Sequence, residues 1–391
     1  MNSKSKYTKE ELWEKQSNAI RDPAQVSGSS NFTDCGIVSD SLKHKVDDSF
    51  VQLLSKMKIT LLISREYEHL LIGLNAENNK LNQTFTNLPH PSGIAINRKT
   101  NTVYVASTRN PNRIIEFKTV KSQIDGTVNS SKVLMPVRAK YFPGAYYFHD
   151  LAFIGEELHG TSVGQNGIVK IDFNSPEHDK LIWFPRCVED ENQKPNTKAN
   201  YIQLNSIAAG SSIEKSFFSA SSDRISKRRP GHKNYPIDKK GVIFSGKTRD
   251  VIARGLTRPH SARFYKGKIW VNNSGYGEVG FIENEKFVSA VKLPGWTRGL
   301  CFYKNIMFVG VSRVLDRFKQ YAPGLKNVKQ QCGIYAINTE NFEILGSINW
   351  LYGNQIFGIE FLDSSNCSGF LHKKVQPSTE NEKNFYYKYF I

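Results

Sequence analysis

A short pattern, in which a pair of mostly polar or small residues precedes an apolar run, recurs six times along the chain. The copies are Ser92-Gly93-Ile94-Ala95-Ile96, His149-Asp150-Leu151-Ala152-Phe153, Asn205-Ser206-Ile207-Ala208-Ala209, His260-Ser261-Ala262-Arg263-Phe264, Arg298-Gly299-Leu300-Cys301-Phe302 and Phe357-Gly358-Ile359-Glu360-Phe361. Their first residues lie 57, 56, 55, 38 and 59 residues apart. This spacing is typical of one four-stranded propeller blade with inserted loops.

Further strand-like runs follow these copies. Second strands are predicted at 102–106, 268–272 and 306–310, and third strands at 113–117 and 277–281. The runs are rich in β-branched and aromatic residues and are bounded by Gly, Asn and Pro, as strands are. Because one such unit cannot bury both of its faces alone, we expect six of them to stack radially. The predicted fold class is therefore all-β, a six-bladed β-propeller.

The ends of the repeat predict how the ring closes. The last copy, at Phe357, has no complete blade after it, whereas strand-like runs at 59–63, 69–73 and 83–85 precede the first copy. We expect one blade to be shared, with its inner strand from the C-terminal segment and its outer strands from the N-terminal segment. Such a closure removes the open edge that a linear array would leave.

Three segments fall outside the repeat. Residues 1–45 are polar and are predicted to be an extension that is either disordered or partly helical, and residues 46–391 a single propeller domain. The segment 223–240 reads as a basic loop between strands, and the aromatic residues 384–391 are expected to pack on an outer blade. The basic residues of the loop are Lys227, Arg228, Arg229, His232, Lys233, Lys239 and Lys240.

Composition adds a strong positive charge to this picture. The chain has 391 residues and a formal net charge of +17, which attracts anions unless it only reflects a Lys- and Asn-rich composition. Five cysteines without a CxxC spacing argue against a disulfide framework or a thiolate zinc site. Without an apolar leader or a long apolar run, we expect a cytoplasmic protein with no membrane span.

The repeat also collects polar side chains at one end of the predicted central channel, because the inner strand of each blade lines the channel. The first repeat positions are Ser92, His149, Asn205, His260, Arg298 and Phe357, and the second positions are Gly93, Asp150, Ser206, Ser261, Gly299 and Gly358. No local spacing rule alone would bring these residues together. We therefore predict the functional site at this channel mouth.

Several kinds of chemistry fit these residues. His149 and His260 are candidate ligands of a divalent metal ion in the channel, or one of them is a general base that Asp150 orients. Arg298 is a candidate anion clamp, or alternatively half of an axial salt bridge to Asp150. We predict His149, Asp150, His260 and Arg298 as catalytic residues. Predicted substrate-binding residues are Asn205, Ser261, Asn273, Tyr276, Trp296 and Arg313.

Four longer motifs stand out along the chain: Leu256-Thr257-Arg258-Pro259-His260-Ser261, Asn273-Ser274-Gly275-Tyr276-Gly277-Glu278, Leu293-Pro294-Gly295-Trp296-Thr297-Arg298-Gly299-Leu300 and Cys332-Gly333-Ile334-Tyr335. Together they resemble a family of bacterial propeller-like proteins that is classed as a domain of unknown function. The resemblance covers roughly residues 50 to 363 and implies the propeller fold without implying a reaction.

The chain departs from the family pattern at two places. Phe357-Gly358 stands where the family tends to have Tyr-Asp, and Ala262 stands where it has Pro. The first difference removes a carboxylate from the predicted mouth. If that carboxylate acts in relatives, the activity of this protein differs from theirs.

Two classes of function remain open from the sequence. One is an enzyme of the lyase, hydrolase or isomerase type that acts on a small polar or anionic, carbohydrate-like substrate at the mouth. The other is a binding or scaffold propeller that recognises an anionic glycan, peptide or protein through its basic loops. Neither a Walker loop nor a GxSxG elbow occurs, and without an RRM, KH or helix-turn-helix pattern we do not expect a nucleic-acid partner.

Overall fold

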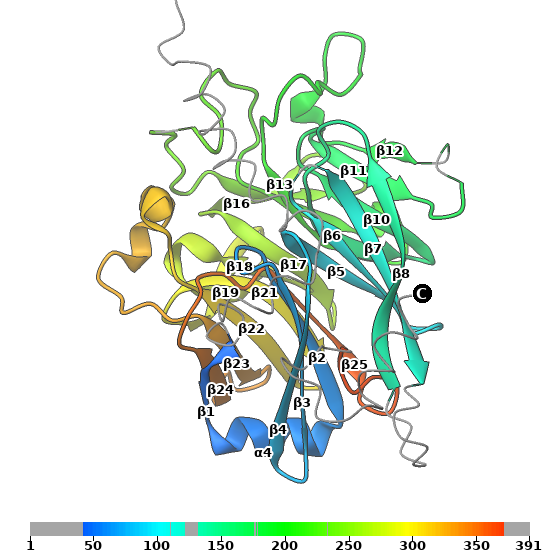
Figure 1. Cartoon of the computed structure of the whole chain (residues 1–391). Coiled ribbons are helices and arrows are strands. Elements are labelled where there is room, and N and C mark those ends of the chain that lie inside the picture. The colour runs from blue at the N-terminus through cyan, green and yellow to red at the C-terminus, as the bar shows by residue number, and fades with distance from the viewer. Residues whose placement is uncertain are drawn as a thin grey trace, which may run out of the picture.

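The computed structural model describes residues 42–109, 111–121, 132–175, 177, 179–232 and 234–370. Within these residues, six antiparallel β-sheets are arranged around a central axis as the blades of a propeller (Figure 1). The predicted all-β, six-bladed fold is confirmed. The predicted C-terminal aromatic segment and most of the predicted N-terminal extension lie outside the described residues.

Five blades are built from consecutive strands that run in order from the axis outward. The first contains β5 (Pro91–Asn97), β6 (Thr102–Ser107), β7 (Asn112–Lys121) and β8 (Lys132–Phe142). The second contains β9 (Phe148–Ile154), β10 (Glu157–Ser162), β11 (Gly167–Ile171) and β12 (Lys180–Trp183), followed by the short 3₁₀-helix η3 (Arg186–Val188). The third contains β13 (Leu204–Ala208), β14 (Phe217–Ala220), β15 (Gly241–Ser245) and β16 (Val251–Leu256), with η4 (Ile213–Lys215) after β13.

The next two blades carry further loop insertions. The fourth contains β17 (Pro259–Tyr265), β18 (Lys268–Asn273), β19 (Glu278–Glu283) and β20 (Lys286–Lys292), with η5 (Ser274–Tyr276) after β18. The fifth contains β21 (Trp296–Tyr303), β22 (Ile306–Ser312), β23 (Gly333–Asn338) and β24 (Ile344–Trp350). Between β22 and β23 lie η6 (Asp316–Tyr321) and η7 (Pro323–Leu325).

The sixth blade joins the two ends of the repeat, as predicted. Its inner strand is β25 (Gly358–Asp363), and its other strands are β2 (Ile59–Arg65), β3 (Leu70–Glu77) and β4 (Lys80–Asn87). Strand β25 pairs with β2 in an unbroken antiparallel register, from Ile59 opposite Asp363 to Ser64 opposite Gly358. In Figure 1 these two strands, drawn in red and blue, lie side by side.

A short N-terminal segment forms a second connection between the fifth blade and the shared sixth blade. Strand β1 (His44–Val46) extends the fifth blade by pairing with β24, and so begins inside the segment that was predicted as an extension. Helix α4 (Asp48–Met57) follows and buries Phe50 and Leu54 in the hydrophobic core. Asp47, just before the helix, accepts hydrogen bonds from the backbone and side chain of Ser347 at 2.7 and 2.9 Å.

The recurring pair of residues coincides with a β-bulge in the inner strands of five blades. The register between first and second strands shifts after Pro91 in β5, after His260 in β17 and after Thr297 in β21, and comparable shifts occur in β9 and β13. A bulge inserts an extra residue and re-aims the side chains beside it. The bulged residues can therefore reach a neighbouring blade as well as the axis.

Hydrogen bonds at this level of the ring, most of them from the inner strands, join every blade to the next, and we call them the inter-blade belt. Its six bonds are Ser64 Oγ to Ser92 O (2.6 Å), Ser92 Oγ to Phe148 O (2.7 Å), Ile207 N to Asp150 Oδ2 (3.0 Å), Ala262 N to Ser206 Oγ (2.7 Å), Gly299 N to Ser261 Oγ (2.9 Å) and Ile356 N to Ser312 Oγ (2.9 Å). Since the donors and acceptors are buried, each bond satisfies a group that water cannot reach.

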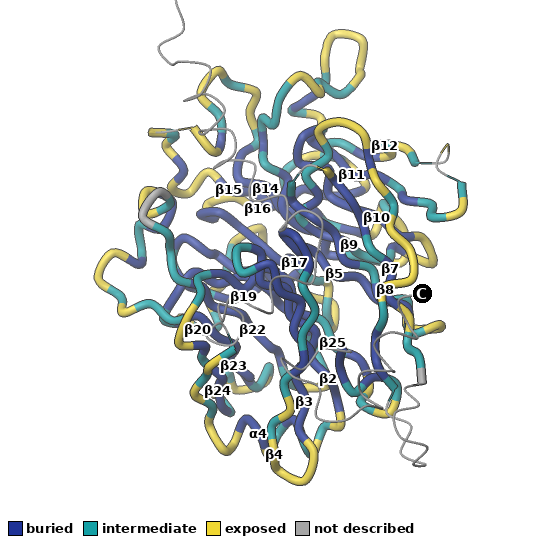
Figure 2. The backbone as a smooth tube through the Cα atoms, viewed as in Figure 1, coloured by how far each residue is buried: buried dark blue, intermediate teal, exposed yellow. Residues whose placement is uncertain are grey.

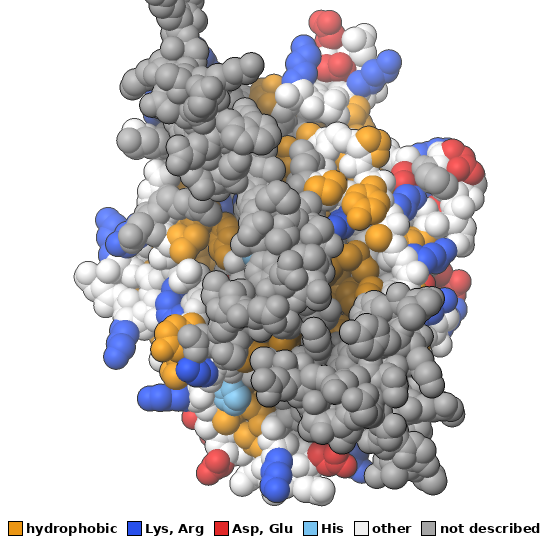
Figure 3. Space-filling model, viewed as in Figure 1, with side chains coloured by type: hydrophobic (Ala, Val, Ile, Leu, Met, Phe, Trp, Pro, Cys, Tyr) orange, Lys and Arg blue, Asp and Glu red, His pale blue; other side chains and the backbone are white. Residues whose placement is uncertain are grey.

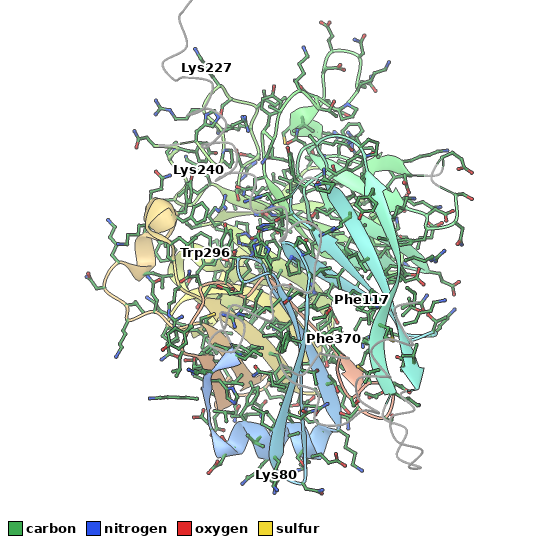
Figure 4. The ribbon with its side chains drawn as sticks, viewed as in Figure 1. Lys80, Phe117, Lys227, Lys240, Trp296 and Phe370 are labelled. Carbon is green, nitrogen blue, oxygen red and sulfur yellow. The ribbon has the colours of Figure 1, made fainter. Side chains whose placement is uncertain are left out.

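Side-chain burial follows the ring. Figure 2 shows buried backbone gathered around the axis and exposed backbone mainly in the outer loops. Between blades the core is aromatic and aliphatic, as where Phe117 and Phe370 meet with ring centroids 5.8 Å apart (Figure 4). On the face in Figure 3, the Lys and Arg side chains that can be seen lie mostly around the margin, with Asp and Glu side chains among them.

The close approach of Gly93 to the second blade, at the level of the belt, generates a stability prediction. A Cβ atom added to Gly93 would lie 2.5 Å from both Asp150 Cα and Leu151 N of the next blade. Because backbone on both sides is fixed, we expect Gly93→Ala to lower the free energy of unfolding by about 3 kcal/mol, measured by urea denaturation. Gly267→Ala is the matched control, since its φ of +75° leaves only local strain and no atom lies within 4 Å. Equal losses in the two variants would contradict the belt's tight packing.

Candidate functional site

A cavity of about 200 Å³ lies at one end of the axis, and we call it the mouth cavity. Its walls come from the starts of inner strands and from the loops after second strands, so several blades contribute side chains. The lining side chains used below are Glu66, Tyr67, Arg109, His149, Gln203, Arg258, Trp296, Arg298, Arg313, Tyr321, Gln355 and Phe357. Of the predicted site residues, the structure thus brings together His149, Trp296, Arg298 and Arg313.

Two long loops border the mouth cavity and contact each other. One runs from Gly231 to Ile237 in the third blade, and the other covers η6 and η7 in the fifth. Ile237, Leu325 and Trp296 share a small hydrophobic cluster, with Trp296 lying toward the centre in Figure 4. Tyr321 Oη also donates a hydrogen bond to His232 O at 3.4 Å. The loops therefore restrict access of water to the residues beneath them.

Arg298, in β21, is held over an aromatic ring beneath this cover. Its Cζ lies 3.4 Å from the centroid of Phe357. With the Gln355 amide oriented to satisfy both neighbours, Gln355 accepts a hydrogen bond from Arg298 and donates one to Glu66 at 3.0 Å. Burial lowers the pKa of Arg298 to about 10, although the charge of Glu66 opposes this shift. Arg298 Nε is buried and has no hydrogen-bond partner.

Arg258 precedes β17 and is the second buried cation of the cavity. Its Cζ lies 5.0 Å from the Tyr321 ring and 5.9 Å from the Trp296 ring, and it donates a hydrogen bond to Gln203. Burial, followed by the charge of Arg298, lowers the pKa of Arg258 to about 10. Its Nε is also buried without a partner. The two arginines therefore repel each other in a poorly solvated place.

The lining of the mouth cavity has a clear charge imbalance. Four arginines, at positions 109, 258, 298 and 313, face a single carboxylate, Glu66. Glu66 is already occupied, because Thr108 Oγ1 and the Gln355 amide donate hydrogen bonds to it. The arrangement favours a negatively charged ligand, since charged groups are buried in proteins when they are paired.

His149, in β9, borders the cavity as an uncharged ring. Burial lowers its pKa well below the ordinary value, and the charges of Arg298, Arg109 and Arg258 lower it further, while Asn205 opposes the shift. The residue is half-buried, because its ring borders the cavity. It meets Phe357 edge-on at 5.5 Å, and its Nδ1 has no hydrogen-bond partner.

His260 lies beside the cavity lining and has a defined tautomer. Its Nδ1 is 2.8 Å from Arg258 O, which can only accept, so Nδ1 carries the proton. Nε2 is then an unprotonated nitrogen, and it is buried without a partner. Burial, followed by the charges of Arg298 and Arg258, lowers the pKa of His260 well below its ordinary value.

The structure places Asp150 away from the mouth cavity, in a different set of contacts. It accepts hydrogen bonds from Ile207 N at 3.0 Å and from Arg263 Nη1 at 2.8 Å. Arg263 lies 4.0 Å from Glu360, which pairs with Arg98 at 2.9 Å. The axial salt bridge considered from the sequence for Arg298 is thus formed by Arg263 instead.

Most of the other predicted binding residues hold backbone groups, and Tyr276 bonds a side chain. Asn205 Nδ2 donates to Pro259 O at 2.8 Å, although its Oδ1 has no partner, and Ser261 belongs to the inter-blade belt. Asn273 accepts from Thr257 N at 2.7 Å, and the Tyr276 hydroxyl donates to Asp238 at 3.1 Å. Arg313 lines the cavity but donates to three backbone carbonyls, those of Gly353, Trp350 and Leu351.

A second ring of residues lies two positions before each repeat pair, and of those that line the cavity only Trp296 was predicted from the sequence as a site residue. Gln203, Arg258 and Gln355 stand there, together with Trp296, and all four line the cavity. In four of the six copies this position has a left-handed backbone, with φ between 50° and 55° at His90, Tyr147, Gln203 and Arg258. These residues could have been found from the sequence, because each stands two positions before the first residue of a repeat pair.

Neither a dense metal-binding cluster nor a membrane-spanning helix occurs in the described part of the chain. No group of three or more His, Cys, Asp and Glu side chains that could hold a metal ion is found among the residues that the structure describes. The metal site at His149 and His260 stays a prediction. No helix within the same described ranges is long and apolar enough to cross a membrane.

Comparison with known families gives one match over most of the chain. The model of a family described as a domain of unknown function, DUF4915, matches residues 48–371. The chain belongs to the DUF4915 family. This agrees with the resemblance seen in the sequence motifs. A search of the curated proteins finds no match to this DUF4915 member.

Solved structures resemble this DUF4915 chain in fold. A chain of a nidogen–laminin complex has a TM-score of 0.50 at 8% identity, covering 78% of this chain and 98% of its own. A gluconolactonase from Xanthomonas campestris and a luciferin-regenerating enzyme have TM-scores of 0.42 and 0.44, each at 11% identity. They cover 67% and 68% of this chain and 77% of their own chains. The first likeness supports the propeller fold, and none carries a function over.

The buried neutral histidines predict a pH dependence of stability. Because the folded-state pKa of His149 lies well below that of the unfolded chain, about 6.5, the unfolded state binds more protons on acidification. The stabilisation is fully present above about pH 6.5 and is lost as the pH falls toward the folded-state pKa, at up to about 1.4 kcal/mol per pH unit.

Urea unfolding from pH 7.5 to 5 therefore checks this expectation. His149→Gln should reduce the slope of unfolding free energy against pH, whereas His232→Gln, at an exposed position, should not. If the slope is unchanged in His149→Gln, the pKa of His149 does not differ between the folded and unfolded states, and this expectation is wrong.

Proposed function

We propose that the mouth cavity binds a small organic anion and that the protein is an enzyme acting on it there. The observation that carries the proposal is the set of four arginines facing one occupied carboxylate in a cavity of about 200 Å³. This size limits the ligand to a small molecule. A carboxylate or phosphate group would pair with the guanidinium groups and offset the burial of their charges.

The unpartnered Nε atoms of Arg258 and Arg298 are the proposed first contacts. Both guanidinium groups are already stacked on aromatic rings, so their planes are fixed before a ligand arrives. A guanidinium fixed in this way loses little conformational entropy when it binds an anion. The flat indole of Trp296 would provide a wall for a carbohydrate-like acid.

His149 is the proposed proton-transfer residue. It faces the cavity, it is uncharged at neutral pH, and its Nδ1 is free of hydrogen bonds. Lyase, hydrolase and isomerase reactions on organic acids all need a proton to be taken or given at the substrate, which a neutral imidazole performs. His260 Nε2 and Asn205 Oδ1 are further buried acceptors next to this group, and we assign them a positioning role.

A divalent metal ion at His149 and His260 has less support than an anion. The arginine charges that, after burial, lower the pKa of both imidazoles would also repel a cation at their nitrogens. Only two imidazoles and an amide oxygen would serve as ligands, without a carboxylate.

Arg258 offers a test in which stability and binding move in opposite directions. Arg258→Gln removes a buried charge that Arg298 repels, so we expect the variant without added ligand to be more stable by about 1 kcal/mol. The same variant should bind small anions at least tenfold more weakly, because a charged contact is lost. Thermal unfolding and calorimetric titration with phosphate, sulfate, succinate and gluconate measure both effects.

The control for this experiment is Arg186→Gln, which removes a positive charge at a side chain that is 63% exposed. It should change neither quantity. If none of the four anions binds the unaltered protein, or if Arg258→Gln binds them equally well, the proposed function is wrong.

Proton uptake tests the role of His149 separately. The negative charge of a bound anion should raise the pKa of His149, so that binding near pH 6 takes up part of a proton. Titration in two buffers with different ionisation enthalpies measures this uptake, and His149→Gln should abolish it while the arginines still bind the anion. Equal proton uptake in His149→Gln would assign the proton to another group.

A further inference from the structure

A second hollow, separate from the mouth cavity, lies at the third blade, and we call it the outer groove. It has a volume of about 590 Å³ and is formed by the loop between β14 and β15 together with Arg254 of β16. It shares no lining residue with the mouth cavity. We propose that the outer groove is a binding site for a ligand with a chain of phosphate groups.

The charge of the groove is strongly positive. Five cationic side chains line it, those of Arg224, Arg228, Lys239, Lys240 and Arg254, against one carboxylate, Asp223. The formal sum is therefore +4. Asp223 is already engaged, since Arg254 donates to it and Arg224 Nε lies 3.9 Å away.

Three of the cations are left for a ligand. Arg228, Lys239 and Lys240 form no ion pair with another described residue, although Arg228 makes a long hydrogen bond of 3.5 Å to Asn234 O. Figure 4 shows Lys227 and Lys240 directed away from the blades on the same side of the molecule. Several exposed cations that lie close together repel one another and gain by sharing a multivalent anion.

The groove is fixed by its backbone and by buried anchors. Ile237 of the same loop is buried in the cluster that contains Trp296. Lys239 N donates to Thr257 Oγ1 at 2.9 Å, and Arg224 N donates to Ser222 Oγ at 3.2 Å. The charged residues are thus held around a formed hollow, unlike those of a solvated charge run.

The chemistry of the groove favours several linked phosphates over a single anion. A monoanion on exposed side chains gains little free energy in water, whereas an oligophosphate engages several of them at once. Tyr235 and Pro236 add an apolar wall at the groove. Such a wall would contact the nucleoside part of a nucleotide, so an inorganic oligophosphate and a nucleoside triphosphate are the two sources of this chemistry.

Calorimetric titration of the full chain with tripolyphosphate tests the proposal. Lys239→Gln/Lys240→Gln should weaken binding at least tenfold and reduce its dependence on salt concentration. The matched control is Lys286→Gln/Lys292→Gln, which removes two exposed lysines from β20 in the neighbouring blade and should bind as the unaltered chain does. Thermal unfolding of both variants checks that the fold is kept.

Further titrations distinguish an inorganic oligophosphate from a nucleotide, and the outer groove from the mouth cavity. Equal affinity for tripolyphosphate and ATP indicates recognition of phosphate alone, and tighter ATP binding that Tyr235→Ala removes indicates a nucleotide. Lys239→Gln/Lys240→Gln should leave succinate binding at the mouth cavity unchanged, so failure here does not affect the proposed function. The proposal is overturned if tripolyphosphate does not bind, if the two double variants bind it alike, or if a single-stranded DNA oligonucleotide binds the groove more tightly than either phosphate ligand.

Discussion

The inter-blade belt is the interaction on which the rest of this structure depends. Each blade presents a hydroxyl, a carboxylate or a backbone group to the next inner strand at the same level of the axis, and the bulges make this geometry possible. Where the pair contains glycine, as at Gly93, the two backbones approach so closely that no side chain fits between them. This tight ring determines where the residues on either side of it can point, and so it positions the mouth.

The electrostatics of the mouth follow from that packing. Close approach of the inner strands, with two loops meeting beside them, keeps water from Arg258 and Arg298 and lowers the pKa of each guanidinium to about 10. Burial, followed by the charges of these arginines, lowers the pKa of His149 and His260 and holds both rings in the neutral form. Cations and uncharged bases are thus maintained side by side at neutral pH, a combination suited to binding an acid and moving a proton. Glu66 is the one lining carboxylate, and it does not balance the four arginines.

Much of the fold was predictable because blade packing leaves a periodic trace in the sequence. The repeated pair and its spacing indicated six blades, and the incomplete ends indicated the shared one. Side-chain direction was less predictable. Asp150 and Ser261 hold neighbouring blades because a bulge turns them there, and a bulge shifts the register without changing residue types. Arg258 and Gln203 were not predicted as site residues, because they lie in the left-handed turn before each inner strand and not in the strand pattern. Strand β1 is only three residues long, so its sequence gives no strand pattern, and only its pairing with β24 identifies it.

The shared blade has a consequence for how the protein is made. Ile59 pairs with Asp363, so β2 leaves the ribosome about 300 residues before its partner β25 exists. Until then β2 and its neighbours form a three-stranded sheet with an open edge strand, Ile59–Arg65, whose residues are all buried in the finished fold and which another chain could pair with. Contacts so distant in sequence also slow folding, because chain entropy is lost before the strands join. The open edge of β2 therefore stays accessible to other chains until β25 is made, and chaperone demand should be highest just before β25 emerges.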